Sequence, residues 1–198
     1  MGDSHLEVLV LGHSFVTRAE RHLLSKGDNN CAMHPGSHNV VLKGRSGAHI
    51  RDIIPLFQQR SVTPHLVIID IGTNDLTNNR ITTHSLANQV YSTAKHLIDH
   101  YGVERVVILE VLPRTTWGRH GAPISFAGRV SRYNAMIRSL VFRGKLSVPV
   151  TFWYHPGLSI SPDTFILDGV HLNPSGLAKY IKSIRRLILK TTRSIMGR

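Results

Sequence analysis

The chain has 198 residues, 41% of them hydrophobic, which fits one globular domain with a substantial buried core. No apolar run approaches the roughly 20 residues that cross a bilayer, the N-terminus lacks the basic start of a signal peptide, and a single cysteine excludes an intrachain disulfide. These features predict an intracellular, cytoplasmic protein. The 24 Lys and Arg residues against 12 Asp and Glu residues give a formal charge of +12, so polyanions are candidate partners at low salt.

Short β-branched runs alternate with helical stretches along the chain. In chain order, the expected strands cover residues 6–11, 39–43, 65–71, 104–112 and 148–154, and the helices that follow them cover residues 15–27, 48–60, 84–102, 126–144 and 174–190. The strands are continuous apolar runs, as expected when helices cover both faces of a sheet. The alternation predicts parallel pairing with right-handed crossovers. We therefore expect residues 1–198 to form one three-layer α/β/α sandwich, with a flavodoxin-like five-stranded sheet and a basic C-terminal helix.

An open parallel sheet binds its ligand beyond the carboxyl ends of the strands, where the winding reverses. A flavodoxin-like strand order of 2-1-3-4-5 places the first strand between the second and the third. The segments that follow these three strands then converge, and they are Gly12-His13-Ser14, "KGRSGAHI" (43–50) and "IGTNDLTNN" (71–79).

Ser14 stands where an apolar strand gives way to a helix, on a turn that Gly12 introduces. A hydroxyl in this place can act as a nucleophile, because backbone N–H groups at a helix N-terminus stabilise an anion formed beside them. The alternative is an ordinary serine N-cap. The segment is not a G-x-S-x-G elbow, since Val16 stands where the second glycine would be.

Gly47 and Asn74 follow the next two strands. A glycine at position 47 allows backbone N–H groups to approach a ligand closely, although an ordinary turn glycine explains it equally well. The amide of Asn74 can donate to a developing oxyanion, or it can form an Asx turn. We expect Asp75 to hold its own loop together rather than to act on a substrate.

Asp168 and His171 lie three residues apart in "LDGVHLNPSG", just before the last helix. The carboxylate can accept from one imidazole nitrogen while the other faces outward, which is the orientation that a general base needs. A histidine held for structural reasons is the alternative.

Taken together, these segments resemble the SGNH or GDSL-like hydrolases. "VLGHSFV" is similar to the nucleophile block of that family, "GRSGA" to its glycine block, "IGTND" to its asparagine block and "DGVHLN" to its Asp-x-x-His block. The resemblance implies hydrolysis of a small acyl-ester substrate, a carboxylic ester or a thioester, through an acyl-enzyme, without a metal or an organic cofactor, and it leaves the acyl-chain length open. It assigns Ser14 as nucleophile, His171 as base and Asp168 as its orienting acid. The oxyanion hole would consist of the Ser14 and Gly47 N–H groups and the Asn74 amide.

His13 departs from the family pattern, which has Asp before the serine. That Asp is mainly a structural hydrogen-bonding residue, so its replacement puts the rigidity of the nucleophile turn in question. The site is also more positive without it, which favours an anionic substrate. On this hypothesis, His13→Asp weakens the binding of charged esters and spares neutral ones.

Two further segments carry possible chemistry. Cys31, His34 and His38 have a metal-like spacing but no convincing fourth ligand. The loop "TTWGRHGAP" (115–123) either covers the site as a substrate-reading loop or is a plain surface loop.

Two other functions remain open from the sequence. One is a weak or inactive member of the same fold that binds an anionic or acylated ligand. The other is an interaction module whose basic last helix, "KYIKSIRRLILKTTRSIMGR", docks on nucleic acid or an anionic membrane surface. A solvated helix face is the simpler interpretation of that helix, because few aromatic residues are interleaved with its cations for base stacking.

Overall fold

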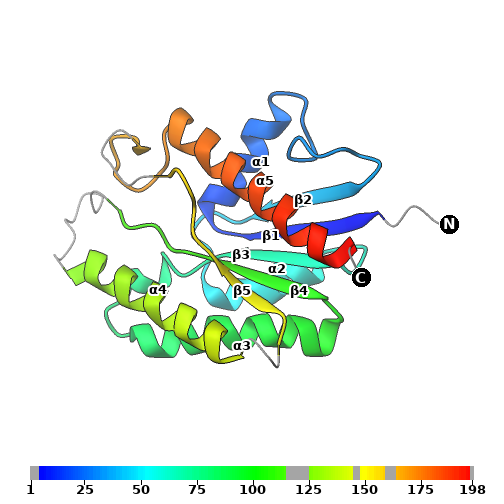
Figure 1. Ribbon diagram of the computed structural model, residues 1–198. Helices are drawn as coiled ribbons and strands as arrows, with labels where there is room; N and C mark the ends of the chain where they lie inside the picture. Colours follow the sequence, from blue (N-terminus) through cyan, green and yellow to red (C-terminus); the bar gives the residue numbers. More distant parts are fainter. Residues whose placement is uncertain (1–4, 115–124, 145–147, 159–163, 197–198) are drawn as a thin grey trace.

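The computed structural model describes residues 5–114, 125–144, 148–158 and 164–196. Its centre is a five-stranded, fully parallel sheet with the order β2-β1-β3-β4-β5 (Figure 1). The strands are β1 (Leu6–Gly12), β2 (His38–Gly44), β3 (Leu66–Asp70), β4 (Arg105–Leu109) and β5 (Val150–Trp153). The predicted flavodoxin-like strand order is therefore confirmed.

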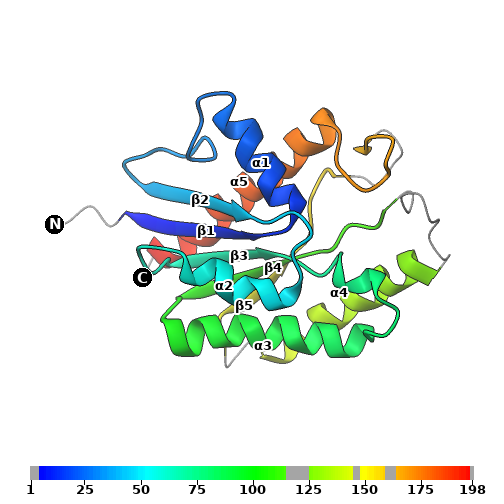
Figure 2. The same ribbon diagram turned by 180° about the vertical axis from the view of Figure 1, so that it is seen from behind.

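Helices cover both faces of the sheet and complete the predicted α/β/α arrangement (Figure 2). One face packs against α1 (Ser14–Leu24) and α5 (Pro174–Met196), and the other against α2 (Ile53–Gln58), α3 (Thr83–Tyr101) and α4 (Ser125–Gly144). Each face has its own core of buried apolar side chains, because every strand presents alternate residues to opposite sides. No described helix is both long and apolar enough to span a membrane.

The second helix is shorter than the sequence pattern predicts. A single 3₁₀ turn, η1 (Ile50–Asp52), precedes the six-residue α2. Pro55 explains the difference, because proline lacks an N–H and clashes with the carbonyl four residues earlier, so it is tolerated only in a helix's first turn. The helix therefore cannot begin at residue 48.

The carboxyl ends of β2, β1 and β3 lie side by side, since Gly12 is in register with both Gly44 and Asp70. Atoms of neighbouring segments come close to the backbone at both Gly12 and Gly44. A Cβ added to Gly12 would come within 2.4 Å of the Asp70 carbonyl oxygen, and one added to Gly44 within 2.4 Å of the Thr17 nitrogen. Only glycine fits at these positions, and the segments that follow leave the sheet from one compact edge.

Candidate active site

Ser14 is the first residue of α1, and the N-cap of that helix is His13. The His13 Nδ1 atom accepts a hydrogen bond from the Phe15 N–H, with 3.4 Å between the nitrogens. The alternative explanation of Ser14 as an N-cap is therefore wrong. Ser14 is half-buried at the helix N-terminus, where the helix dipole and the unpaired N–H groups of the first turn favour negative charge.

His13 is part of a buried chain of polar groups that ends inside the protein. It is 2% exposed, and its Nε2 atom lies 3.2 Å from the Asp70 Oδ1 atom. The other carboxylate oxygen accepts from the Tyr180 hydroxyl at 2.6 Å. Burial on its own would raise the pKa of Asp70, but the charge and hydrogen bond of His13, together with the Tyr180 hydrogen bond, hold that pKa below its usual value.

This network bears on two expectations for His13, a less rigid nucleophile turn and a preference for anionic substrates. The nucleophile turn keeps an anchor, because His13 caps α1 and also binds the end of β3 through Asp70. The imidazole is directed at a buried carboxylate rather than at solvent. His13 therefore adds no cationic surface for a substrate, and the inference of an anionic substrate loses its basis.

Asn74 joins the two loops predicted to meet beyond the sheet. Its Nδ2 donates to the Ala48 carbonyl at 2.9 Å, beside Gly47. Its Oδ1 accepts from the Arg114 Nη2 at 3.0 Å, and the Arg114 Nε donates to the Thr73 hydroxyl at 3.3 Å. These bonds fix the amide so that Oδ1 points to the cation, and the second Nδ2 hydrogen remains for another acceptor.

Gly47 and Asp75 shape the same edge. Gly47 adopts a φ of +76° in an exposed turn after β2, a conformation that side chains disfavour. Asp75 is buried, and its carboxylate accepts from the Ile50 N–H at 3.3 Å and faces the His49 Nδ1 atom at 3.2 Å. These contacts agree with the structural role predicted for Asp75.

Asp168 and His171 form a hydrogen-bonded pair within a single tight loop. The Asp168 Oδ2 and His171 Nδ1 atoms are 2.6 Å apart, and the Oδ1 atom accepts from the N–H groups of Val170 and His171, each at 2.8 Å. Burial alone would raise the pKa of Asp168, but these hydrogen bonds outweigh it and lower the pKa. With Nδ1 held by an ionised carboxylate, Nε2 is the nitrogen that can accept a proton.

The loop that carries this pair lies at the Ser14 end of the sheet. Figures 1 and 2 both show the segment before α5 at the same end of the strands as the start of α1. The Phe15 and Tyr180 rings, 5.9 Å apart, join the two helices there. The predicted residues thus gather at one end of the molecule, while the predicted substrate loop 115–123 lies outside the described residues.

The sequence also matches a known protein family. Residues 3–179 match the model of the GDSL-like lipase/acylhydrolase family. The chain belongs to this family. Membership makes it an ester hydrolase of the GDSL type, as its sequence blocks imply. No curated protein matches the sequence.

Solved structures with the same fold include several ester hydrolases. A GDSL-like lipase from Bacteroides thetaiotaomicron shares 18% identity with a TM-score of 0.72, over 93% of this chain and 88% of that one. A catalytic mutant of an acetylxylan esterase from Geobacillus stearothermophilus shares 14% identity with a TM-score of 0.62, over 94% of each chain. A family 3 carbohydrate esterase from Clostridium thermocellum shares 17% identity with a TM-score of 0.64, over 97% and 99% of the two chains.

The sequence analysis of this GDSL-like hydrolase missed Arg114 and Tyr180. Arg114 follows Pro113 after β4 and is 40 residues from Asn74, so no local spacing connects the two. Tyr180 reads as a core residue of an amphipathic helix, and only the fold shows that its hydroxyl reaches Asp70. Both residues act through contacts between distant segments.

The metal-like residues are engaged in other contacts. His38 faces the hydroxyls of Ser37 and Thr192 at 2.8 and 3.1 Å, and His34 accepts from the Gly36 N–H. Cys31 is buried, and burial raises the pKa of its thiol to about 12. In the described part of the chain, no group of three or more His, Cys, Asp or Glu side chains is arranged to hold a metal ion.

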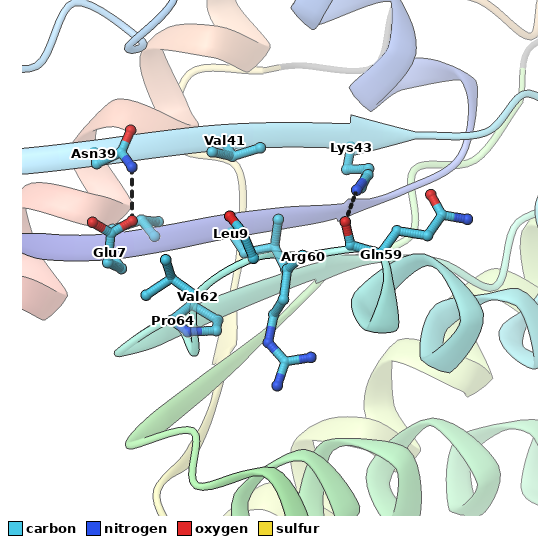
Figure 3. Close-up of a pocket in the computed structure, with 11 residues that line it drawn as sticks. Glu7, Leu9, Asn39, Val41, Lys43, Gln59, Arg60, Val62 and Pro64 are labelled. Atoms are coloured by element: carbon cyan, nitrogen blue, oxygen red, sulfur yellow. Dashed lines mark hydrogen bonds between the residues drawn. The ribbon is translucent and has the colours of Figure 1, made fainter.

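A hollow of about 180 Å³ lies along β1 and β2, beside the segment that precedes β3 (Figure 3). Its polar groups bond to one another: Asn39 donates to Glu7 at 2.7 Å, and the Lys43 ammonium donates to the Gln59 carbonyl at 2.9 Å. The Arg60 guanidinium lies 3.5 Å from the centre of the Phe57 ring. The charged groups of this hollow thus already have partners in the protein, and no predicted catalytic residue lines it.

Proposed function

We propose that this GDSL-like hydrolase cleaves carboxylic esters or thioesters through an acyl-enzyme on Ser14. The observation that carries the proposal is the 2.6 Å pair of His171 and Asp168, located at the sheet end where Ser14 begins a helix. A base of fixed orientation beside a helix N-terminus is the arrangement that acyl transfer needs.

In the first half of the reaction, the His171 Nε2 atom takes the Ser14 hydroxyl proton as Oγ attacks the carbonyl carbon. The tetrahedral intermediate collapses when its C–O or C–S bond breaks, and His171 gives the proton to the leaving alcohol or thiol. In the second half, His171 deprotonates a water that attacks the acyl-enzyme, and the carboxylic acid and free Ser14 are regenerated. Asp168 holds the imidazole in one tautomer and stabilises its protonated form.

The oxyanion of each tetrahedral intermediate would be bound by the N–H groups of Ser14 and Gly47 and by the Asn74 amide. Donors fixed before the reaction starts stabilise developing charge without a cost of reorganisation. The contacts of Asn74 with Ala48 and Arg114 support this role, because they hold the amide in one orientation. Arg114 is then a positioning residue that also adds positive charge near the oxyanion.

We propose a small acyl group for the substrate. Two of the structural neighbours are named as an acetylxylan esterase and a carbohydrate esterase. The former was solved as a catalytic serine-to-alanine mutant, which supports a serine nucleophile in the shared fold. The proposed reaction needs no metal or organic cofactor, since the base, the nucleophile and the oxyanion donors are all side-chain or backbone groups.

The decisive experiment is hydrolysis of p-nitrophenyl esters, from acetyl to long acyl chains, by the wild type and by Ser14→Ala. We expect turnover that falls by about 10³-fold or more in the variant, with the highest rates for short chains. A chelator should leave the rate unchanged. Folded wild type with no turnover above the variant on any ester would instead favour the inactive module that binds an acylated or anionic ligand.

A further inference from the structure

The charge of the chain is divided unevenly along its length. Residues 1–110 contain ten basic residues (Lys and Arg) and ten acidic residues (Asp and Glu). Residues 111–198 contain fourteen basic residues and two acidic ones. The whole net charge of +12 therefore belongs to the second segment, which supplies α4, β5 and α5. Figure 1 shows β5 at the edge of the sheet with α5 on one side and α4 on the other. A neutral half and a strongly cationic half thus meet within one fold.

The described cations of α5 from Lys182 to Arg193 are exposed. Neither α4 nor α5 contains an acidic residue, and in the described residues no ion pair involves either helix. Lys182, Arg186 and Lys190 follow one another at intervals of four, so like charges are neighbours on the helix surface and destabilise it. A hollow of about 470 Å³ runs along this surface, lined by Lys182, Arg185, Arg186, Leu189, Lys190 and Arg193.

Aromatic side chains lie at the end of β5, between α5 and α4, and on α4 itself. Phe142 and Tyr154 are 78% and 47% exposed. Among the large hydrophobic residues that are exposed in the described part of the chain, these two are the aromatic ones. Both line a second hollow, of about 610 Å³, between α4 and β5. The Arg138 guanidinium lies 5.4 Å from the Tyr154 ring centre. On the other side of the strand, the Lys190 ammonium lies 5.6 Å from the Trp153 ring centre.

We propose that this surface, which we name the β5 face, binds single-stranded nucleic acid. The β5 face consists of the α5 cations from Lys182 to Arg193, the aromatic residues Trp153 and Tyr154, and Arg138 and Phe142 of α4. The phosphates lie along the α5 cations, and unpaired bases stack on Tyr154 and Phe142. A cationic track beside aromatic platforms is how proteins hold single strands without reading their sequence.

The same observations argue against the other polyanions. A duplex keeps its bases paired and stacked, so it would leave Phe142 and Tyr154 without a partner. A membrane surface requires a helix with an exposed apolar face, but between residues 177 and 193 the large apolar side chains of α5 pack against the sheet, and among these only Leu189 and Ile181 are partly exposed. The aromatic residue of α5, Tyr180, is buried, so the accessible aromatic rings come from the end of β5 and from α4.

The extent of the surface sets the expected salt dependence. Lys182 and Arg193 are separated by roughly 16 Å along α5 at 1.5 Å per residue, and the cations of α4 widen the surface. Contact with about five phosphates of a single strand gives a slope of about −3.5 in log K against log salt. Affinity should then fall by about a hundredfold between 50 and 200 mM salt.

The test measures the anisotropy of a fluorescent 20-nucleotide oligo-dT with the full chain at 50 mM salt. Arg186→Gln/Lys190→Gln should lose at least tenfold in affinity. The matched control, Arg51→Gln/Arg80→Gln, removes the same charge from exposed positions in the neutral half and should stay within twofold of the wild type. Thermal unfolding checks folding, and Arg186→Gln/Lys190→Gln should be no less stable than the wild type, since it relieves like-charge repulsion.

A second pair of variants separates the aromatic contribution from the cationic one. Phe142→Ala/Tyr154→Ala should weaken binding of oligo-dT at least fivefold and leave binding of heparin unchanged. Ser14→Ala should bind oligo-dT like the wild type, because the proposal does not depend on ester hydrolysis. The proposal is overturned if the wild type fails to bind oligo-dT, if both double charge variants lose affinity equally, or if duplex DNA or phosphatidylserine vesicles bind more tightly than the single strand.

Discussion

The pairs His13–Asp70 and His171–Asp168 lie at the same end of this molecule, but their surroundings differ. His13 and Asp70 are both almost completely buried, with side chains 3% and 4% exposed, whereas those of His171 and Asp168 are 26% and 37% exposed. Both nitrogens of His13 are engaged, one by the Phe15 N–H and one by Asp70. In the second pair, the carboxylate engages only Nδ1 of the histidine.

The difference shows that a His–Asp contact does not by itself indicate catalysis. The buried pair is an internal charge arrangement that fixes the start of α1, and a substrate cannot reach it. The half-exposed pair is made by one short loop, so its removal disturbs little else in the fold. Of these two pairs, the half-exposed one fits the proposed base, whereas the buried one anchors the start of α1.

The largest expected effect is on activity, from the exposed pair. His171→Ala should lower kcat by about 10⁴-fold, because it removes the proposed base. Its melting temperature should stay within about 2 °C of the wild type, since the side chain is partly exposed and its contacts are local. Ester hydrolysis and thermal unfolding on the same preparation check both statements. A large loss of stability would show that the two pairs are not distinct in the way described.

The next effect is on stability, from the buried pair. His13→Asp would place a second carboxylate beside buried Asp70 and leave the Tyr180 hydroxyl as the donor to that group. We expect a loss of roughly 3–5 kcal/mol in the free energy of unfolding, the usual consequence of an uncompensated buried charge. This expectation replaces the sequence-based one, in which the same substitution altered only the binding of charged esters.

Denaturant unfolding measures this loss, and Asp70→Asn provides the control. The double variant His13→Asp/Asp70→Asn has one carboxylate again, so it should recover about half or more of the lost stability. Equal stability of the single and double variants would mean that the two side chains do not interact.

His155 differs from both pairs, because its contact with a carboxylate is made by its backbone N–H, which donates to Glu110 at 2.6 Å. His155 is 5% exposed and faces the Ser183 hydroxyl at 3.0 Å. Burial lowers its pKa to about 4, while the charge of Asp70 acts more weakly in the opposite direction. The unfolded chain, with a histidine pKa of about 6.5, binds more protons than the folded one between these values. Stability should therefore fall as the pH is lowered from about 6.5 to 4, by up to about 3 kcal/mol.

The measurement is the free energy of unfolding across this pH window for the wild type and His155→Gln. The variant should show a shallower dependence, although its stability at neutral pH is also lower. Below pH 4 both proteins should lose stability further, because the lowered pKa values of Asp70 and Asp168 make folding favour their ionised forms. An unchanged slope in the variant would assign the acid sensitivity to other groups.

Much of this architecture was predictable because its signals are local. The five strands are continuous apolar runs separated by helices, and this pattern predicts a parallel sheet covered on both faces; the flavodoxin-like order is one of the two common ones for such an alternation. The Asp168–His171 pair was predictable for the same reason, since both partners lie within one turn of chain. The short α2 was also within reach, because Pro55 restricts where that helix can begin.

The remaining features depend on contacts that no short segment contains. In the sequence, His13 is only a departure from a family motif. In the fold, β3 places Asp70 beside it, and α5 places Tyr180 beside Asp70. Arg114 reads as one of many arginines until β4 places it beside Asn74. The β5 face likewise combines cations and aromatic rings from two helices and a strand. Such features require the fold, because the sequence gives no measure of distance between segments.

The smallest predicted effect concerns Arg114, whose role is to act through Asn74. Arg114→Ala should lower kcat by about tenfold with little change in KM, because the oxyanion amide loses its fixed orientation rather than its substrate contacts. Asn74→Ala should cost about 10²-fold. In the Asn74→Ala background, removal of Arg114 should cost less than threefold, since the group that it orients is already gone.

Arg129 is the matched control for this cycle. It donates to the carbonyls of Leu76, Asn78 and Ile81, and therefore holds the same loop without touching Asn74. Arg129→Ala should lower the melting temperature, and its effect on kcat should be the same with or without Asn74. Added guanidinium should restore part of the rate of Arg114→Ala and none of that of Arg129→Ala. Independent, additive effects of Arg114 and Asn74 would show that the arginine only supports the loop, and the 3.0 Å contact between them would then have no part in the reaction.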